Sequence, residues 1–175
     1  DPQSEEVRFL SRVMGHLTVR KRGDLLELDF PVDTLSKCEL PGIMAESLGS
    51  VPAECLMGRT DYLLLYGSET EIINMKPDFR TLAGTGARGV IVTAPGDTVD
   101  FVSRCFFPQI GIDEDPVTGS AHTTLTPFWS ARIGKKTMKA RQLSARGGVL
   151  ECTLDGDRVH IAGSAILYLK GEIYV

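Results

Sequence analysis

Apolar and polar residues alternate in the first thirty positions of the chain, which is the pattern of strands with one buried face. The alternating segments cover residues 6–10, 17–20 and 25–30. Gly15 and the turn Arg22-Gly23-Asp24 separate them. The pattern predicts a three-stranded antiparallel meander with one face exposed to water.

The rest of the chain predicts a mainly antiparallel sheet around one helix, which is an α+β class. Residues 31–41 have the composition of a linker. Helical segments are expected at 43–48, 78–82 and from about 119 to Ile133. Strands are expected at 62–66, 90–94, 99–106, 138–143, 149–154, 158–162 and 165–169. The longest helix has few charges, so we expect other elements to enclose it, and Pro127 should kink it or leave a backbone carbonyl free.

Composition and charge exclude several classes of protein. The 175 residues carry a formal net charge of -4, which argues against a nucleic-acid-binding surface. No apolar run is long enough to span a bilayer, and we expect neither a membrane span nor a signal peptide. The four cysteines form no C-x-x-C pair, and the three histidines lack the spacing of zinc ligands. We therefore expect a cytoplasmic protein with reduced cysteines and no metal.

Residues 113–122, D-E-D-P-V-T-G-S-A-H, are the segment richest in candidate chemistry. Two acids and a proline turn precede a glycine and a hydroxyl at the start of the long helix. This pattern is typical of a capped helix after a turn. It also suits a carboxylate that faces an anion held by the free N–H groups of a helix N-terminus. The segment by itself leaves both interpretations open.

Two motif matches do not fit their structural context. Residues 84–89 match G-x-G-x-x-G, but they precede an expected strand, whereas a dinucleotide-binding loop follows a strand and opens a helix. Ser120 lacks the G-x-S-x-G setting of a hydrolase nucleophile. The sequence therefore predicts neither a dinucleotide site nor a serine hydrolase.

Four segments together resemble the PhzF-like (phenazine biosynthesis-like) isomerase family. They are R-C-F-F-P at 104–108, G-I-D-E-D-P-V-T-G-S-A-H at 111–122, Q-L-S-A-R-G-G at 142–148 and D-G-D-R-V at 155–159. The resemblance implies the diaminopimelate-epimerase-like fold, in which two pseudo-symmetric halves each curl a mostly antiparallel sheet around a central helix. It implies that 1–33 are closing strands of the N-terminal half, 34–162 the C-terminal half-domain, and 163–175 strands that return to pair with the opening meander.

The same resemblance implies an activity and a site. Family members catalyse a proton shift on a small carboxylate substrate without a metal or organic cofactor, in a cleft between the two halves. Asp115 matches the catalytic aspartate, and Gly119 and Ser120 match residues that hold substrate. Arg146 is a candidate contact for an anionic substrate, with a structural ion pair beside a glycine bulge as the alternative. His122 lies in the motif and also suits a buried structural role. A homodimer is expected.

The chain departs from the family pattern at its start. The N-x-S-E-T-like segment with the general acid–base glutamate and the G-H-A-T-like helix opening have no counterpart in it. We therefore expect the C-terminal portion of a longer protein, whose cleft needs the N-terminal half or a companion chain. The meander should lack sheet partners, which predicts an exposed apolar edge, a companion chain or a missing upstream segment. Two alternatives stay open: a non-catalytic binding or scaffold protein with this fold, and a two-cysteine racemase in which Cys105 is the only nearby thiol.

Overall fold

The computed structural model describes residues 5–172, and its strands form one mixed sheet in the order β1-β2-β3-β11-β10-β9-β8-β7-β6-β5-β4. The strands are β1 Glu6–Ser11, β2 Gly15–Arg22, β3 Leu25–Pro31, β4 Ser36–Lys37, β5 Glu54–Met57, β6 Asp61–Leu65, β7 Gly89–Pro95, β8 Phe101–Phe106, β9 Thr137–Gln142, β10 Gly148–Asp155 and β11 Arg158–Gly163. Neighbouring strands are antiparallel except in the pairs β6–β7 and β8–β9. The α+β class predicted from the sequence is confirmed.

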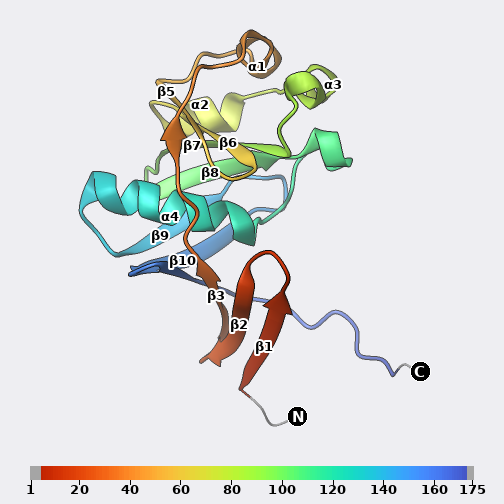
Figure 1. Ribbon diagram of the computed structural model, residues 1–175, viewed down its shortest axis with the longest axis vertical. Helices are drawn as coiled ribbons and strands as arrows, with labels where there is room; N and C mark the ends of the chain where they lie inside the picture. Colours follow the sequence, from red (N-terminus) through yellow and green to blue (C-terminus); the bar gives the residue numbers. More distant parts are fainter. Residues whose placement is uncertain (1–4, 173–175) are drawn as a thin grey trace.

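Helices cover both faces of the central strands (Figure 1). The helices are α1 Gly42–Leu48, α2 Glu69–Asn74, α3 Phe79–Leu82 and α4 Gly119–Ile133, with short 3-10 turns η1 Ala83–Thr85 and η2 Pro108–Ile110. Along β8, Phe101 and Cys105 point into the core beneath α4, while Val102 and Phe106 point into the core beneath α1, α2 and α3. Side chains of a strand alternate between faces, so β8 serves both cores.

The longest helix, α4, is enclosed as its composition predicts. Eight of its residues are buried, and the helix continues through Pro127 to its end at Gly134, which has φ 70. Trp129 stacks on Phe101 with ring centroids 5.8 Å apart. No helix in the described part of the chain is long and apolar enough to cross a bilayer.

The opening meander forms as predicted and is continuous with the rest of the sheet. β2 pairs with β1 and β3, and β3 pairs in turn with β11 through neighbours such as Leu28 and Ile161. The apolar edge expected on the meander is present: Val7 and Phe9 are 51% and 53% exposed. These side chains lie on the same sheet face as Leu28, but β1 lies beyond the strands that α4 contacts.

The strand expected over 165–169 is not found. Residues 164–172 have no regular secondary structure and run away from the meander (Figure 1), while residues 173–175 lie outside the described part. The expected return pairing with the meander is therefore wrong for the described residues. The inner edge of the meander, at β3, is already hydrogen-bonded to β11, so it offers no free backbone groups to a further strand. The division at 33 and 163 stays a prediction.

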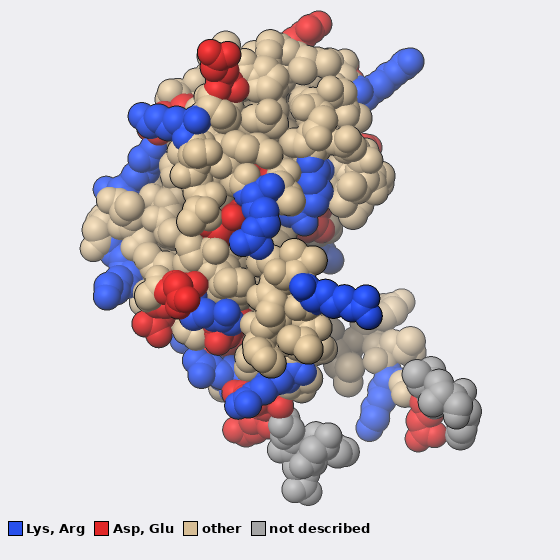
Figure 2. Space-filling view, viewed as in Figure 1, with Lys and Arg blue, Asp and Glu red and all other residues tan. Residues whose placement is uncertain are grey.

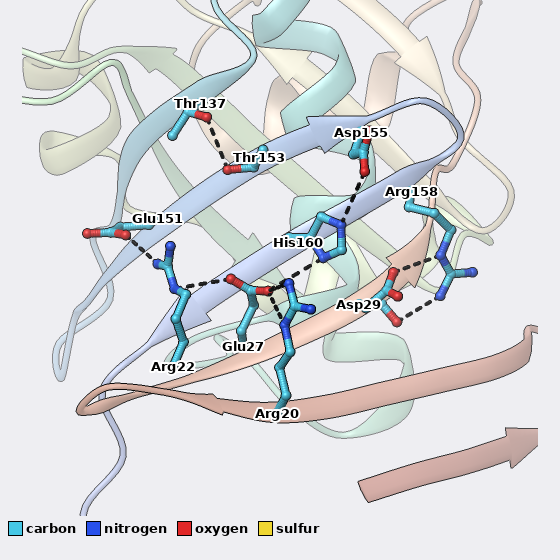
Figure 3. A network of polar contacts seen from close by, with 10 residues as sticks. All are labelled: Arg20, Arg22, Glu27, Asp29, Thr137, Glu151, Thr153, Asp155, Arg158 and His160. Carbon is cyan, nitrogen blue, oxygen red and sulfur yellow. Dashed lines mark hydrogen bonds and ion pairs between the residues drawn. The ribbon is translucent and has the colours of Figure 1, made fainter. Parts of the chain in front are cut away.

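The outer face of the meander carries a network of charged side chains (Figure 3). Glu27 is 5% exposed and forms ion pairs with Arg20 at 2.5 Å and Arg22 at 3.1 Å. Arg158 on β11 binds Asp29 on β3 at 2.7 Å. This face is the one that the sequence predicts to be wet, and its charges tie β2, β3 and β11 together.

Candidate active site

The site is built on the N-terminus of α4, where Thr118 is the N-cap residue. The N–H groups of the first helical turn have no carbonyl partner within the helix. Thr118 itself is held by Gln142 of β9, whose Oε1 accepts the Thr118 N–H at 2.8 Å. The same side chain donates from Nε2 to the Asp115 carbonyl at 2.7 Å. Gln142 is 1% exposed, so a buried amide fixes the turn that enters the helix.

Asp115 lies just before this helix with one carboxylate oxygen anchored. Its Oδ2 accepts a hydrogen bond from Thr118 Oγ1 at 2.5 Å, and its N–H donates to the Cys105 carbonyl at 3.0 Å. Its Oδ1 has no hydrogen-bond partner among residues 5–172. The residue is half-buried, so the carboxylate is oriented and still has one oxygen that can exchange a proton.

The other acids of the motif have different surroundings. Glu114 forms a two-pronged ion pair with Arg104, at 2.7 and 2.9 Å, and both side chains are largely buried. Asp113 is exposed. Glu114 therefore holds the segment against β8, and Asp115 is the acid of the motif that is available for chemistry.

Gly119 and Ser120 form the first turn of α4, as the motif predicts. A Cβ on Gly119 would lie 3.3 Å from Leu28 Cδ1, so the glycine lets the helix approach β3 closely. Ser120 is exposed and lines a cavity of about 260 Å³ between the meander and α4. Apolar residues Leu17 and Phe30 form one side of this cavity.

Sequence reasoning missed the arginine beside Ser120. Arg88 lines the same cavity and donates to Ser120 Oγ at 3.4 Å. Its guanidinium pairs with both carboxylate oxygens of Asp61, and that carboxylate raises the pKa of Arg88. Arg88 is the fifth residue of the G-x-G-x-x-G match at 84–89, which does not fit a dinucleotide-binding loop. No local signal identifies it, because its neighbours in the cavity come from distant segments.

Arg146 lies in a different cavity, of about 520 Å³, formed by the loop between β9 and β10. Ser120 does not line that cavity, and Arg146 does not line the cavity beside Ser120. The loop nevertheless touches the motif, because Ser144 Oγ donates to the Pro116 carbonyl at 2.7 Å. Arg146 forms no ion pair with any residue in the described range, so the alternative of a structural ion pair is not supported.

His122 is fully buried one turn into α4. Its Nδ1 lies 2.8 Å from the Thr118 carbonyl oxygen. Burial lowers the pKa of the imidazole to about 4, so the ring is neutral at physiological pH and Nδ1–H donates this bond. Nε2 has no partner among residues 5–172. His122 thus supports the N-cap residue from inside the core.

Cys105 does not suit the racemase alternative. The residue is completely buried on β8, and burial raises the pKa of its thiol. Acid–base work by a cysteine needs an accessible thiolate at neutral pH. The surroundings of Cys105 favour the protonated thiol over the thiolate and exclude solvent.

Charge on the visible surface forms no single basic area. In Figure 2, Lys and Arg side chains are interspersed with Asp and Glu side chains over the face shown. Arg132, at the end of α4, pairs with Glu54, and Lys135 pairs with Asp100. Both of these basic side chains near the end of α4 are thus paired with an acid.

Comparison with known proteins yields several related chains. A family model described as "Phenazine biosynthesis-like protein" matches residues 10–171. Two uncharacterized isomerases of Pseudomonas aeruginosa are 46% and 47% identical, cover 100% and 99% of this chain, and are themselves covered over 67% and 66% of their length. A phenazine biosynthesis-like domain-containing protein of Mus musculus is 36% identical over 91% of this chain and 62% of its own.

Solved structures agree with these relatives. The crystal structure of a PhzF-family phenazine biosynthesis protein from Enterococcus faecalis superposes with a TM-score of 0.89 at 41% identity, covering 99% of this chain and 66% of that one. The chain spans about two thirds of the length of the relatives it matches. The family match continues across the boundary expected near residue 33. The chain belongs to the phenazine biosynthesis-like (PhzC-PhzF) family.

Proposed function

We propose that the protein is an isomerase that moves a proton between two carbon atoms of a small carboxylate-bearing substrate. The observation that carries this proposal is the Asp115 carboxylate, anchored through one oxygen beside the open N-terminus of α4. The names of the Pseudomonas aeruginosa relatives support the reaction class.

In this proposal, the helix N-terminus binds the substrate carboxylate. The N–H groups of Gly119 and Ser120 and the Ser120 hydroxyl donate to its oxygens, with the positive end of the helix dipole behind them. Arg146, which lines a separate cavity beside the motif, stays a candidate contact for an anionic group of the substrate. Asp115, as carboxylate, removes a proton from carbon through Oδ1 and later returns it, or passes it to a second acid–base group. Proton transfer of this kind needs no organic cofactor or metal.

A second wall completes the cleft in this proposal. The relatives are longer than this chain, and the meander exposes the apolar side chains of Val7 and Phe9. A further part of the family domain, or a companion chain, would cover this face and supply the acid–base partner of Asp115. Assembly as a homodimer in the cytoplasm is part of the same proposal.

The second candidate is a binding protein without catalysis. The cavity beside Ser120 favours it, because Arg88 and an apolar wall can hold a small carboxylate without any proton transfer. The two functions differ in one measurable property, which is exchange of substrate hydrogen with solvent.

The deciding experiment incubates the full-length protein with a panel of small cyclic and amino-acid-like carboxylates in deuterated water. NMR then follows deuterium at carbon. We expect incorporation into at least one substrate and a loss of about 100-fold or more in Asp115→Asn. The matched control is Asp113→Asn, which changes an exposed acid of the same motif and should leave exchange intact. Equal exchange in wild type and Asp115→Asn would refute the assignment, and binding without exchange would favour the second candidate.

A further inference from the structure

Two cysteines that are far apart in the sequence meet at the edge of the sheet. Cys38 and Cys55 stand 17 positions apart, and their Sγ atoms are 3.4 Å from each other. Cys38 follows β4 and Cys55 lies on β5. The sequence predicts four isolated thiols, so this contact is a product of the tertiary structure.

The backbone holds the two residues directly opposite each other. In the antiparallel pair β4–β5, Ser36 faces Met57 and Lys37 faces Leu56, so the next facing pair is Cys38 and Cys55. The Cys38 N–H donates to the Cys55 carbonyl at 3.2 Å, which continues the ladder by one residue. Facing residues of such a hydrogen-bonded pair have Cα atoms about 5.5 Å apart, within the range of about 4.4–6.8 Å that a disulfide spans.

Both thiols are within reach of small molecules in solution. Cys38 and Cys55 are each partly exposed, and β4 is the outermost strand at this end of the sheet. The other two cysteines, Cys105 and Cys152, are completely buried. The chain therefore contains one accessible pair of thiols and two inaccessible thiols that serve as internal controls.

We propose that Cys38 and Cys55 are a redox-modification site that forms a reversible disulfide by exchange with a low-molecular-weight disulfide such as oxidised glutathione. The Cys38 thiolate attacks one sulfur of the oxidant, so a Cys38–glutathione bond forms and one glutathione thiolate leaves. Cys55 then attacks the Cys38 sulfur and releases the second glutathione. Two cysteine thiols are oxidised, one small disulfide is reduced to two thiols, and the two cysteine protons pass to the released glutathiones.

The surroundings of Cys55 set this order of steps. Burial and the neighbouring Cys38 raise the pKa of Cys55 to about 12, so Cys55 is a thiol at neutral pH and a poor first nucleophile. Once Cys38 carries glutathione, its sulfur lies beside Cys55, because the two Sγ atoms are only 3.4 Å apart in the reduced form. This proximity favours attack by Cys55 as the second step.

The bond would restrain the segment that enters the candidate site. It closes a loop that contains α1, and Cys38 lies a few residues after Asp33, which lines the cavity beside Ser120. Asp33 Oδ2 accepts the Arg59 N–H at 3.1 Å and the Thr124 hydroxyl at 3.3 Å. The oxidised form therefore fastens the connection between the meander and α1, and its formation is independent of any isomerase activity.

The test equilibrates the full-length protein with mixtures of reduced and oxidised glutathione, quenches by acid, and maps disulfides by mass spectrometry. We expect an intramolecular Cys38–Cys55 bond that reduced glutathione reverses, and an increase in Tm of roughly 5–10 °C in the oxidised form. Cys55→Ser should accumulate one glutathione on Cys38, whereas Cys38→Ser should react much more slowly. Cys105→Ser should form the bond as the wild type does.

Two outcomes would overturn the proposal. One is an absence of the Cys38–Cys55 bond in excess oxidised glutathione while the protein stays folded. The other is equal glutathione uptake by all four cysteines, which would show that the pair has no special reactivity. Exchange of substrate hydrogen with solvent is measured separately, so failure of this proposal leaves the isomerase proposal intact.

Discussion

The sheet face that packs against α4 continues across the opening meander, but the two regions are covered differently. Val7 of β1, Val19 of β2, Leu28 of β3 and Ile161 of β11 face one another along one row. Ile161 is 2% exposed beneath α4, whereas Val7 at the other end of the row is 51% exposed. The residue types are alike, and the presence of a covering helix makes the difference.

The polar groups of the two regions also differ in their exposure to water. At the start of α4, buried polar groups such as Gln142 and Thr118 satisfy one another at fixed positions. On the meander, the charged side chains lie on the outer face, where water competes with their ion pairs. The candidate site is therefore closely packed and hydrogen-bonded on its α4 side and uncovered on its meander side. Changes at α4 should therefore cost more stability than changes on the meander.

The largest effect is expected from protonation of His122. Its folded-state pKa of about 4 lies below the unfolded value of 6.5, so the unfolded state binds the proton first. The contribution of neutral His122 to the free energy of unfolding is fully present above about pH 6.5. As the pH drops toward 4, the free energy of unfolding falls by about 3 kcal/mol because of this group. Urea unfolding between pH 7 and pH 4 measures it. His122→Asn should flatten this part of the profile, and an unchanged slope would contradict the assignment.

A somewhat smaller loss is expected from Gln142→Met. The change keeps the volume but leaves the Thr118 N–H and the Asp115 carbonyl without partners in a buried place. We expect a loss of about 2–3 kcal/mol in the free energy of unfolding. Gln109→Met, at an exposed position in η2, provides a matched surface control. If Gln142→Met lowers the free energy of unfolding no more than the control variant does, water satisfies the two backbone groups.

On the meander, Glu27→Gln should have an intermediate effect. Glu27 is buried, but Arg20 and Arg22 are 49% and 47% exposed and keep much of their hydration when the carboxylate is removed. We expect a loss of about 1–2 kcal/mol, measured by urea unfolding at low and high salt. Asp155→Asn, on a side chain 79% exposed, should change stability little. If the two variants behave alike, the network in Figure 3 contributes no stability.

The smallest effect is expected from Phe9→Ser. Phe9 is 53% exposed, so its loss should change the stability of this chain by no more than about 0.5 kcal/mol. The same change should reduce self-association, which sedimentation velocity measures, because it removes part of the uncovered apolar face. A stability loss comparable to that of Gln142→Met would show that the meander is covered in solution.

Local patterns predicted much of the fold. The alternation of residues in the meander, the glycine stop after α1 at Gly49 and the sparse charge of α4 all correspond to observed elements. Strand β5 and helix α2 were missed, because their short segments lack a clear period. The strand expected over 165–169 failed for another reason: the inner edge of the meander, at β3, is already paired with β11.

The residues of the candidate site also fall into those that local sequence predicted and those that it did not. The motif around residues 113–122 predicted that Asp115, Gly119 and Ser120 lie together at a helix start, because they are close in the chain. Their roles in catalysis and binding stay predictions. Arg88 and Gln142 could not be found in this way, since they reach the motif from the residue before β7 and from the end of β9.

Local residue patterns account for the order and type of most elements, the capped start of α4 and the family, because each depends on residues within a few turns or strands of one another. Tertiary packing placed Arg88 rather than Arg146 beside Ser120, and it brought Cys38 to Cys55. It also decided which apolar residues are covered. Those outcomes depend on strand order and register, which bring together segments whose separation in the chain carries no local signal.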